Sequence, residues 1–278
     1  MLLAPVSSCH RRRNAAPTGD AAVAEAIVPR AQPAPEFDEH PSIEAVPAPA
    51  LEASLLKKCP TTSGATTDEI KLAMGKQLDC LEEYLASSWK RAVAAARRAD
   101  PKRAEQLTEL SQKWTGLARA ACFVEEQRSW VDFHTGLRTD GSAYGAMEMR
   151  CRLTAAQEQI YLATAMQRAN PHPVAARIES LAPQGETLRR LIEYIARRCA
   201  HFLRTPPERD AGAAEQGLRP FEEWDQTEEA ALAVLRQTRP VANSMCTNWP
   251  GLARLLGGAP DCERKTALYM YRMWIVSS

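Results

Sequence analysis

The sequence has no long apolar run and no excess of charge of either sign. No stretch of about 18 consecutive apolar residues occurs in its 278 residues, which argues against a membrane-spanning helix. Lys and Arg number 35 against 34 Asp and Glu, so the net charge of +1 offers little attraction to nucleic acid. The length predicts roughly two domains, at about 150 residues for each.

Aromatic residues and catalytic motifs are also scarce. Aromatics make up 6% of the chain whereas Ala and Arg are frequent, which favours helices over a β-sandwich. None of the GxSxG, Walker, HExxH or GxGxxG motifs is present. Cys122 and His134 are a weak basis for a nucleophile pair, and Glu125-Glu126 is expected to be a solvated helix face. We therefore expect no enzymatic activity and no cofactor.

The cysteines do not follow a metal-binding spacing. None forms a CxxC pair or lies near a His at zinc-ligand spacing, which argues against a zinc site. They are either buried free thiols or disulfides between neighbouring helices, and their number and spacing favour disulfides. Disulfides require an oxidising compartment, so we expect a periplasmic or secreted protein. The eight are Cys9, Cys59, Cys80, Cys122, Cys151, Cys199, Cys246 and Cys262.

The N-terminal part is rich in proline and poor in large apolar residues. Residues 1–56 hold eight of the 19 prolines, which predicts a disordered Pro/Ala-rich tail or linker. Within it, Val6-Ser7-Ser8-Cys9 is similar to the end of a bacterial lipoprotein signal, in which Cys9 would be acylated. The apolar stretch before Cys9 is short and no basic region precedes it. The match is either a truncated signal, whose lipid would be the only link to a membrane, or chance.

Apolar residues at helical spacing predict an all-α, antiparallel bundle beyond the tail. Thr66 and Glu69 form a capping-box pattern at the start of a long helix, and Asp100-Pro101 begins a second one. Residues 133–145 carry three glycines and are expected to be a loop. The further expected helices begin near 146, cover 174–181 and 186–203, start at Pro220, and end the chain over 261–275.

The order of these elements predicts two helical domains, over 57–168 and 173–278. In each, a long helix carries a Cys, a second helix ends near another Cys, and a third Cys opens the last helix. This order favours a diverged internal duplication, so the halves would be related. The alternative is that any two antiparallel helical bundles look alike at this level.

A pattern of Cys, Trp, Gly and Ser runs through residues 59–168. It begins with an early Cys pair, continues as a helix that ends in a Trp, an Arg and a Cys, passes a Gly-Ser loop, and closes with Cys-x-x-Thr. This pattern resembles the LprI-like lysozyme-inhibitor family, which comprises small helical domains of the bacterial envelope. The residues that carry the resemblance are Cys59, Cys80, Trp114, Arg119, Cys122, Gly141, Ser142, Cys151 and Thr154.

The resemblance implies a set of disulfides. The expected pairs are Cys59–Cys80, Cys122–Cys151 and, with the pattern extended to the second half, Cys246–Cys262. Cys199 is left over; it pairs with Cys9 if that residue is not acylated, or the pairing differs. The chain also departs from the family pattern, because Arg119 stands five residues after Trp114 where the family has four.

The resemblance further implies that the protein binds and inhibits lysozyme-type muramidases. A lysozyme cleft works with two carboxylates, so an inhibitor gains from a cationic, donor-rich tip. We expect Arg138, Thr139, Ser142 and Tyr144 to supply this tip, on a loop whose ends are joined by a disulfide. The alternative is a non-catalytic interaction module that binds another envelope protein without inhibiting it.

Overall fold

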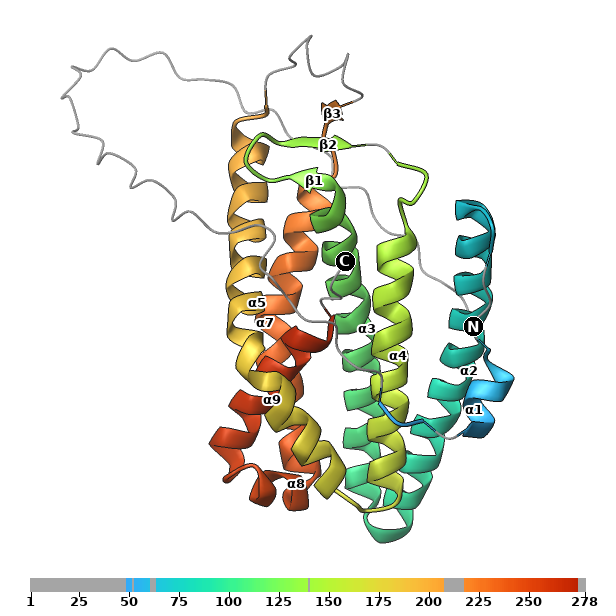
Figure 1. Ribbon diagram of the computed structural model, residues 1–278. Helices are drawn as coiled ribbons and strands as arrows, with labels where there is room; N and C mark the ends of the chain where they lie inside the picture. The colour runs from blue at the N-terminus through green and yellow to red at the C-terminus, as the bar shows by residue number, and fades with distance from the viewer. Residues whose placement is uncertain (1–48, 52, 61–63, 140, 208–217, 275–278) are drawn as a thin grey trace, which may run out of the picture. The chain divides into compact units, whose positions relative to one another are not determined.

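A computed structural model of the chain describes residues 49–51, 53–60, 64–139, 141–207 and 218–274. Eight helices and three short strands lie in these ranges (Figure 1). The elements are α1 Ala53–Lys58, α2 Thr67–Ala99, α3 Pro101–Trp130, β1 Val131–Asp132, β2 Leu137–Thr139, α4 Ala146–Gln167, α5 His172–Arg204, β3 Leu218–Pro220, α7 Trp224–Asn248, α8 Pro250–Leu255 and α9 Ala259–Trp274.

The starts of α2 and α3 are fixed by local hydrogen bonds that the sequence predicts. The Thr66 hydroxyl accepts the Glu69 backbone N–H at 3.3 Å, and the Glu69 carboxylate accepts the Thr66 backbone N–H at 3.1 Å. This is the capping box, and it satisfies two N–H groups that the helix leaves free. Asp100 caps α3 by accepting the Lys102 N–H at 2.9 Å, and Pro101 fills the first helical position.

The long helices pack as two groups of three that share one core. Helix α2 lies against α3 and α4, α5 lies against α7 and α9, and α3 packs on α7 to join the groups. Buried residues of all six helices belong to a single hydrophobic cluster, so the predicted boundary near residue 170 does not separate two cores. The predicted class, an all-α antiparallel bundle with disulfides, is confirmed. No helix in the described ranges is both long enough and apolar enough to span a membrane.

Three disulfides link the helices, with the predicted pairing. Cys59–Cys80 joins the chain just after α1 to α2, Cys122–Cys151 joins α3 to α4, and Cys246–Cys262 joins α7 to α9. The last two occupy corresponding places in the two three-helix groups, from the second long helix to the start of the third. Cys199 is buried in α5 as a free thiol, and Cys9 lies outside the described residues.

The expected loop over 133–145 contains regular structure, which corrects that prediction. Strands β1 and β2 form an antiparallel hairpin, and β3 adds to its β2 edge. Asp132 closes the hairpin turn by accepting the His134 backbone N–H at 2.8 Å, and Gly136 adopts φ +76° there. Pro220 lies in β3 rather than at a helix start, because a proline fits the edge strand of a sheet; the helix begins at Trp224.

The predicted break between helices at 182–185 is also wrong. Helix α5 runs unbroken from His172 to Arg204 with Pro183 inside it, and it bends part-way along (Figure 1). A Cβ on Gly185 would collide with the carbonyl oxygen of Leu268 in α9. Gly185 therefore allows α5 to pack closely on α9. In the sequence alone, such a glycine looks like a helix breaker.

Folded structure begins before Cys59, which shortens the predicted tail of residues 1–56. Helix α1 begins inside that range and buries Leu55, and Leu51 packs against the core. The prolines and alanines on the N-terminal side of α1 made this short helix hard to recognise in the sequence. The rest of the predicted tail, residues 1–48 and 52, lies outside the described residues.

Candidate functional site

The predicted partner-binding loop forms one end of the helical bundle, above α3 and α4 (Figure 1). Thr139, Gly141 and Ser142 are exposed there, and Tyr144 is half-buried. Tyr144 is held in place because its hydroxyl accepts a hydrogen bond from the Gln127 side-chain amide at 3.0 Å. Three of the four predicted contact residues therefore present side chains at this end.

Arg138 does not present a cationic tip, which corrects the prediction for this residue. Its side chain is only 8% exposed, and its guanidinium donates to both carboxylate oxygens of Glu223, at 3.1 and 3.2 Å. It also lies over the Tyr144 ring, 4.8 Å from the ring centre. Arg138 therefore ties the hairpin to the residue that precedes α7, and it positions the loop instead of reaching a partner.

Glu125 and Glu126 are buried, so the expectation of a solvated face is wrong. Glu125 accepts two hydrogen bonds of 2.8 Å from Arg128, and burial raises the pKa of its carboxyl while Arg128 opposes that rise. Glu126 accepts the backbone N–H groups of Gly145 and Glu148, at 2.6 and 2.7 Å. A carboxylate from α3 thus caps the start of α4, where the helix dipole favours negative charge.

Packing under the loop depends on Trp130, which the sequence analysis did not single out. A Cβ on Gly141 would lie 2.7 Å from the Trp130 ring, so a larger residue there would force the ring or the loop to shift. The ring of Trp130 in turn contacts Tyr144, with 6.5 Å between ring centres. Trp130, Gln127 and Glu223 shape the site through tertiary contacts, and no local sequence signal marks them.

The other residues of the family pattern are divided between core and surface. Trp114 is fully buried in the core, and the Cys122–Cys151 disulfide links α3 to α4 below the loop. Arg119 is exposed on α3, 3.6 Å from Glu82 of α2, and the Thr154 hydroxyl donates to the Arg150 carbonyl oxygen within α4. The structure therefore assembles the disulfide and core part of the pattern at the loop, and places Arg119 in a groove between α2 and α3.

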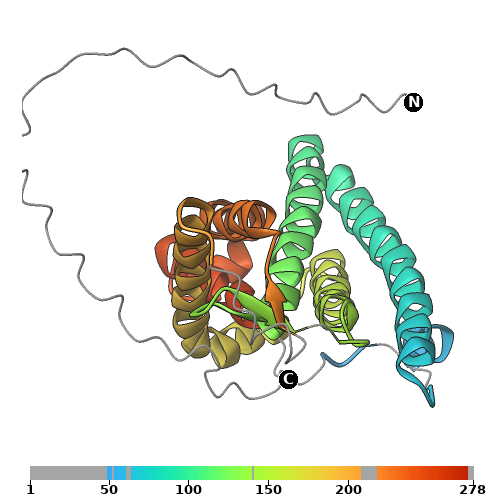
Figure 2. The ribbon, with the colours of Figure 1, turned by 90° about the horizontal axis from the view of Figure 1, so that it is seen from above.

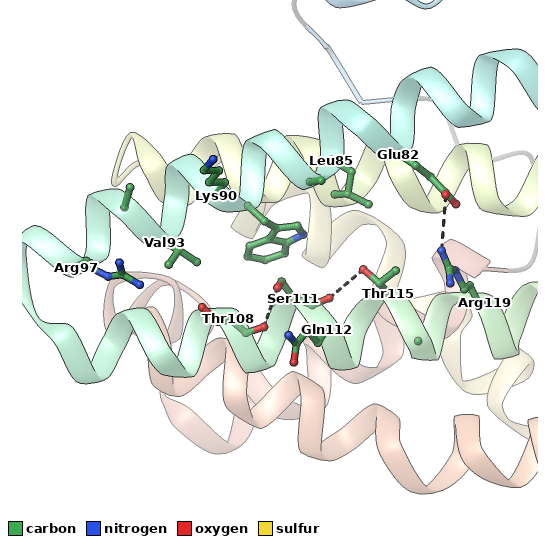
Figure 3. Close-up of a pocket in the computed structure, with 14 residues that line it drawn as sticks. Glu82, Leu85, Lys90, Val93, Arg97, Thr108, Ser111, Gln112, Thr115 and Arg119 are labelled. Atoms are coloured by element: carbon green, nitrogen blue, oxygen red, sulfur yellow. Dashed lines mark hydrogen bonds and ion pairs between the residues drawn. The ribbon is translucent and has the colours of Figure 1, made fainter. Parts of the chain in front are cut away.

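That groove is the second feature of the surface that can hold a ligand. The helices α2 and α3 meet at the Asp100 turn and diverge from it (Figure 2), and the groove between them has a volume of about 840 Å³. Figure 3 shows Leu85 and Val93 of α2 facing Ser111 and Thr115 of α3 across it. Its floor is apolar, which suits a peptide or another elongated apolar group.

A buried ionic network joins α4, α5 and α9. Glu158 is fully buried, accepts hydrogen bonds from Arg177, and also accepts the Tyr269 hydroxyl at 2.8 Å. Burial, together with the charge of Glu158, raises the pKa of Tyr269 well above its usual range. Every member has a partner, so the network is a structural link between the two groups of helices.

The described residues hold no group of three or more His, Cys, Asp or Glu side chains arranged to bind a metal ion. Comparison with protein-family models, with curated proteins and with solved structures yields no significant match to this chain. The resemblance to the lysozyme-inhibitor family therefore depends on its motif residues alone. The loop offers hydrogen bonding to a partner, and the groove offers apolar contact.

Proposed function

We propose that the protein is an exported binding module, periplasmic or secreted, that acts on a protein partner rather than as an enzyme. The observation that carries this proposal is the polar loop held at one end of a disulfide-linked bundle. Three disulfides are compatible with an oxidising compartment. A loop fixed in advance loses little conformational entropy when it binds, which favours tight association.

Several contacts support a rigid loop. The loop is held by the Cys122–Cys151 disulfide at its base, by the Glu126 cap on α4 and by the Arg138–Glu223 ion pair. The Ser142 hydroxyl is exposed, and the Thr139 hydroxyl, on an exposed residue, donates only a long hydrogen bond of 3.5 Å to the Trp130 carbonyl oxygen. Such groups suit hydrogen bonding to carboxylates or backbone carbonyls of a protein partner.

The partner that the motif resemblance favours is a lysozyme-type muramidase, whose cleft works with two carboxylates. In this proposal the hydroxyl-bearing loop, and not Arg138, enters or covers that cleft. The second candidate function, an envelope interaction module without inhibitory activity, is favoured by one observation. Burial of Arg138 removes the cationic group that a carboxylate-lined cleft would attract most strongly.

Introducing negative charge at the loop tests the proposal in the full chain. We expect Thr139→Glu combined with Ser142→Glu to raise the dissociation constant for a muramidase by roughly ten-fold or more, measured by calorimetric titration. Lys102→Glu is the matched control, because it changes the net charge by the same amount at the opposite end of α3, where Lys102 is exposed.

Equal binding by the loop variant and the control would remove the loop from the contact. Stable binding to an envelope protein through the loop, with no effect on any muramidase, would support the second candidate function instead.

A further inference from the structure

The α2–α3 groove combines an apolar floor with a cationic rim. Leu85, Trp89 and Val93 form the floor on the α2 side. On the α3 side, the hydroxyls of Ser111 and Thr115 donate to carbonyl oxygens of their own helix, at 2.8 and 2.9 Å. Because those hydroxyls are already bonded, the groove is suited to apolar side chains.

The rim is more positive than negative. Lys90 and Arg97 line the groove without an ion-pair partner among the described residues, and Arg119 lies at its other end (Figure 3). The one acidic lining residue, Glu82, is already engaged by Arg152 at 2.6 Å and by Arg119 at 3.6 Å. An occupant with acidic groups beside apolar anchors would complement this surface.

We propose that the groove is a docking site for a short acidic, apolar segment, and that the segment Phe37–Glu44 of the same chain occupies it. This segment reads FDEHPSIE. Phe37 supplies an apolar anchor for the floor, and Asp38 and Glu39 supply charges opposite to those of the rim. The inference does not depend on the proposed function, because the groove lies along the helices and away from the loop.

The length of the connecting chain permits this docking. The chain enters the described structure at Pro49, and Ala50 and Leu51 line a hollow together with Ser88 and Arg91, on the side of α2 opposite the groove. A chain that passes half-way around a helix of about 10 Å diameter runs outside its side chains, at a radius of about 10 Å, and covers roughly 30 Å. The twelve residues from Phe37 to Pro49 span up to about 40 Å when extended, so Phe37 can reach the groove.

Attachment to the bundle favours this occupant over a free peptide of the same composition. A tethered segment is present at an effective concentration of about millimolar, set by the length of its linker. Weak contacts of the kind expected here, an apolar anchor with exposed ion pairs, therefore suffice to keep the groove occupied. A partner with a stronger acidic, apolar segment would have to displace Phe37–Glu44.

Photo-crosslinking in the full chain tests the docking. Phe37 is replaced by p-benzoyl-phenylalanine, the protein is irradiated, and crosslinked peptides are identified by mass spectrometry. We expect intramolecular crosslinks to α2 and α3 peptides that line the groove. The same photoreactive residue at Ile27 is the control for nonspecific contact by another position of the N-terminal segment.

Charge reversal makes the test specific. Lys90→Glu with Arg97→Glu is expected to lower the crosslink yield about five- to ten-fold, and Asp38→Lys with Glu39→Lys is expected to restore it. Arg98→Glu with Lys102→Glu is the matched control, because these exposed residues do not line the groove.

Three results would overturn the proposal: crosslinks from position 37 that fall outside the groove, a yield that does not respond to charge reversal, or crosslinks between two copies that increase with protein concentration. The last result would make a second copy the occupant.

Discussion

The free thiol of Cys199 connects a single buried residue to the stability of the fold. Burial, together with the negative charge of Glu228, raises the pKa of Cys199 to about 12. Above about pH 9 the unfolded chain loses this proton while the folded chain keeps it. The contribution of Cys199 to stability is therefore fully present below about pH 9 and is lost as the pH rises towards 12.

We expect this loss to be visible in urea unfolding at pH 8 and pH 10.5. In a Cys9→Ser background, which removes the cysteine that lies outside the described residues, the unfolding midpoint should fall more with pH than in the same protein carrying Cys199→Ala. Tyr269 and Tyr271 also have raised pKa values and remain in both proteins, so the difference isolates the thiol. Equal falls in the two proteins would contradict the buried state of Cys199.

At the level of single residues, the sequence predicted the disulfide pairs better than it predicted which charged side chains are buried. The three disulfide pairs follow from the family pattern and its extension to the second half, and the structure has the same pairs. Arg138 and Glu126 look like surface charges in the sequence. Their partners, Glu223 and the start of α4, come from elements that only the tertiary fold brings near. A charged side chain is buried where such a partner exists, and local sequence does not carry that information.

At the level of whole helices, two glycines show the difference between intrinsic helix propensity and tertiary packing. A Cβ on Gly116 of α3 would meet no neighbouring atom within 4 Å, whereas a Cβ on Gly185 of α5 would collide with the backbone of Leu268 in α9. We expect Gly116→Ala to stabilise the protein by about 0.5–1 kcal/mol, because alanine loses less backbone entropy in a helix. We expect Gly185→Ala to destabilise it by roughly 1–3 kcal/mol through the forced separation of α5 and α9.

Chemical denaturation of the two variants beside the wild type checks the direction of each change in the free energy of unfolding. The two variants are comparable because each replaces a glycine by alanine. Stabilisation by Gly185→Ala would contradict the close packing of α5 on α9.

Element boundaries were predictable where their signals are local. Thr66 and Asp100 cap α2 and α3 as expected, because a helix start depends on a few neighbouring residues. The continuity of α5 through Pro183 was not predictable, since packing against α9 outweighs the local preference for a break. The small sheet was missed because β3 comes from a distant part of the chain and joins β2 only in the folded molecule.

In the molecule as a whole, each disulfide joins two neighbouring elements that contribute to one shared core. Their sequence separations are 21, 29 and 16 residues, and each loop closure of this size removes about 3 kcal/mol of unfolded-state entropy in the simple chain model. The two groups of helices are joined by α3 on α7, by the Glu158 network and by β3 on the hairpin. Reduction should therefore weaken the loop and the bundle that holds it.

A lysis assay with the full chain tests the proposed inhibition of muramidases. Oxidised protein, with its three disulfides mapped, is titrated against muramidases of different classes acting on bacterial cell walls, with a reduced sample alongside. We predict dose-dependent inhibition of at least one class, weakened by reduction because the Cys122–Cys151 disulfide no longer holds the loop. Absence of inhibition across all classes, with the disulfides intact, would contradict the inhibitor function.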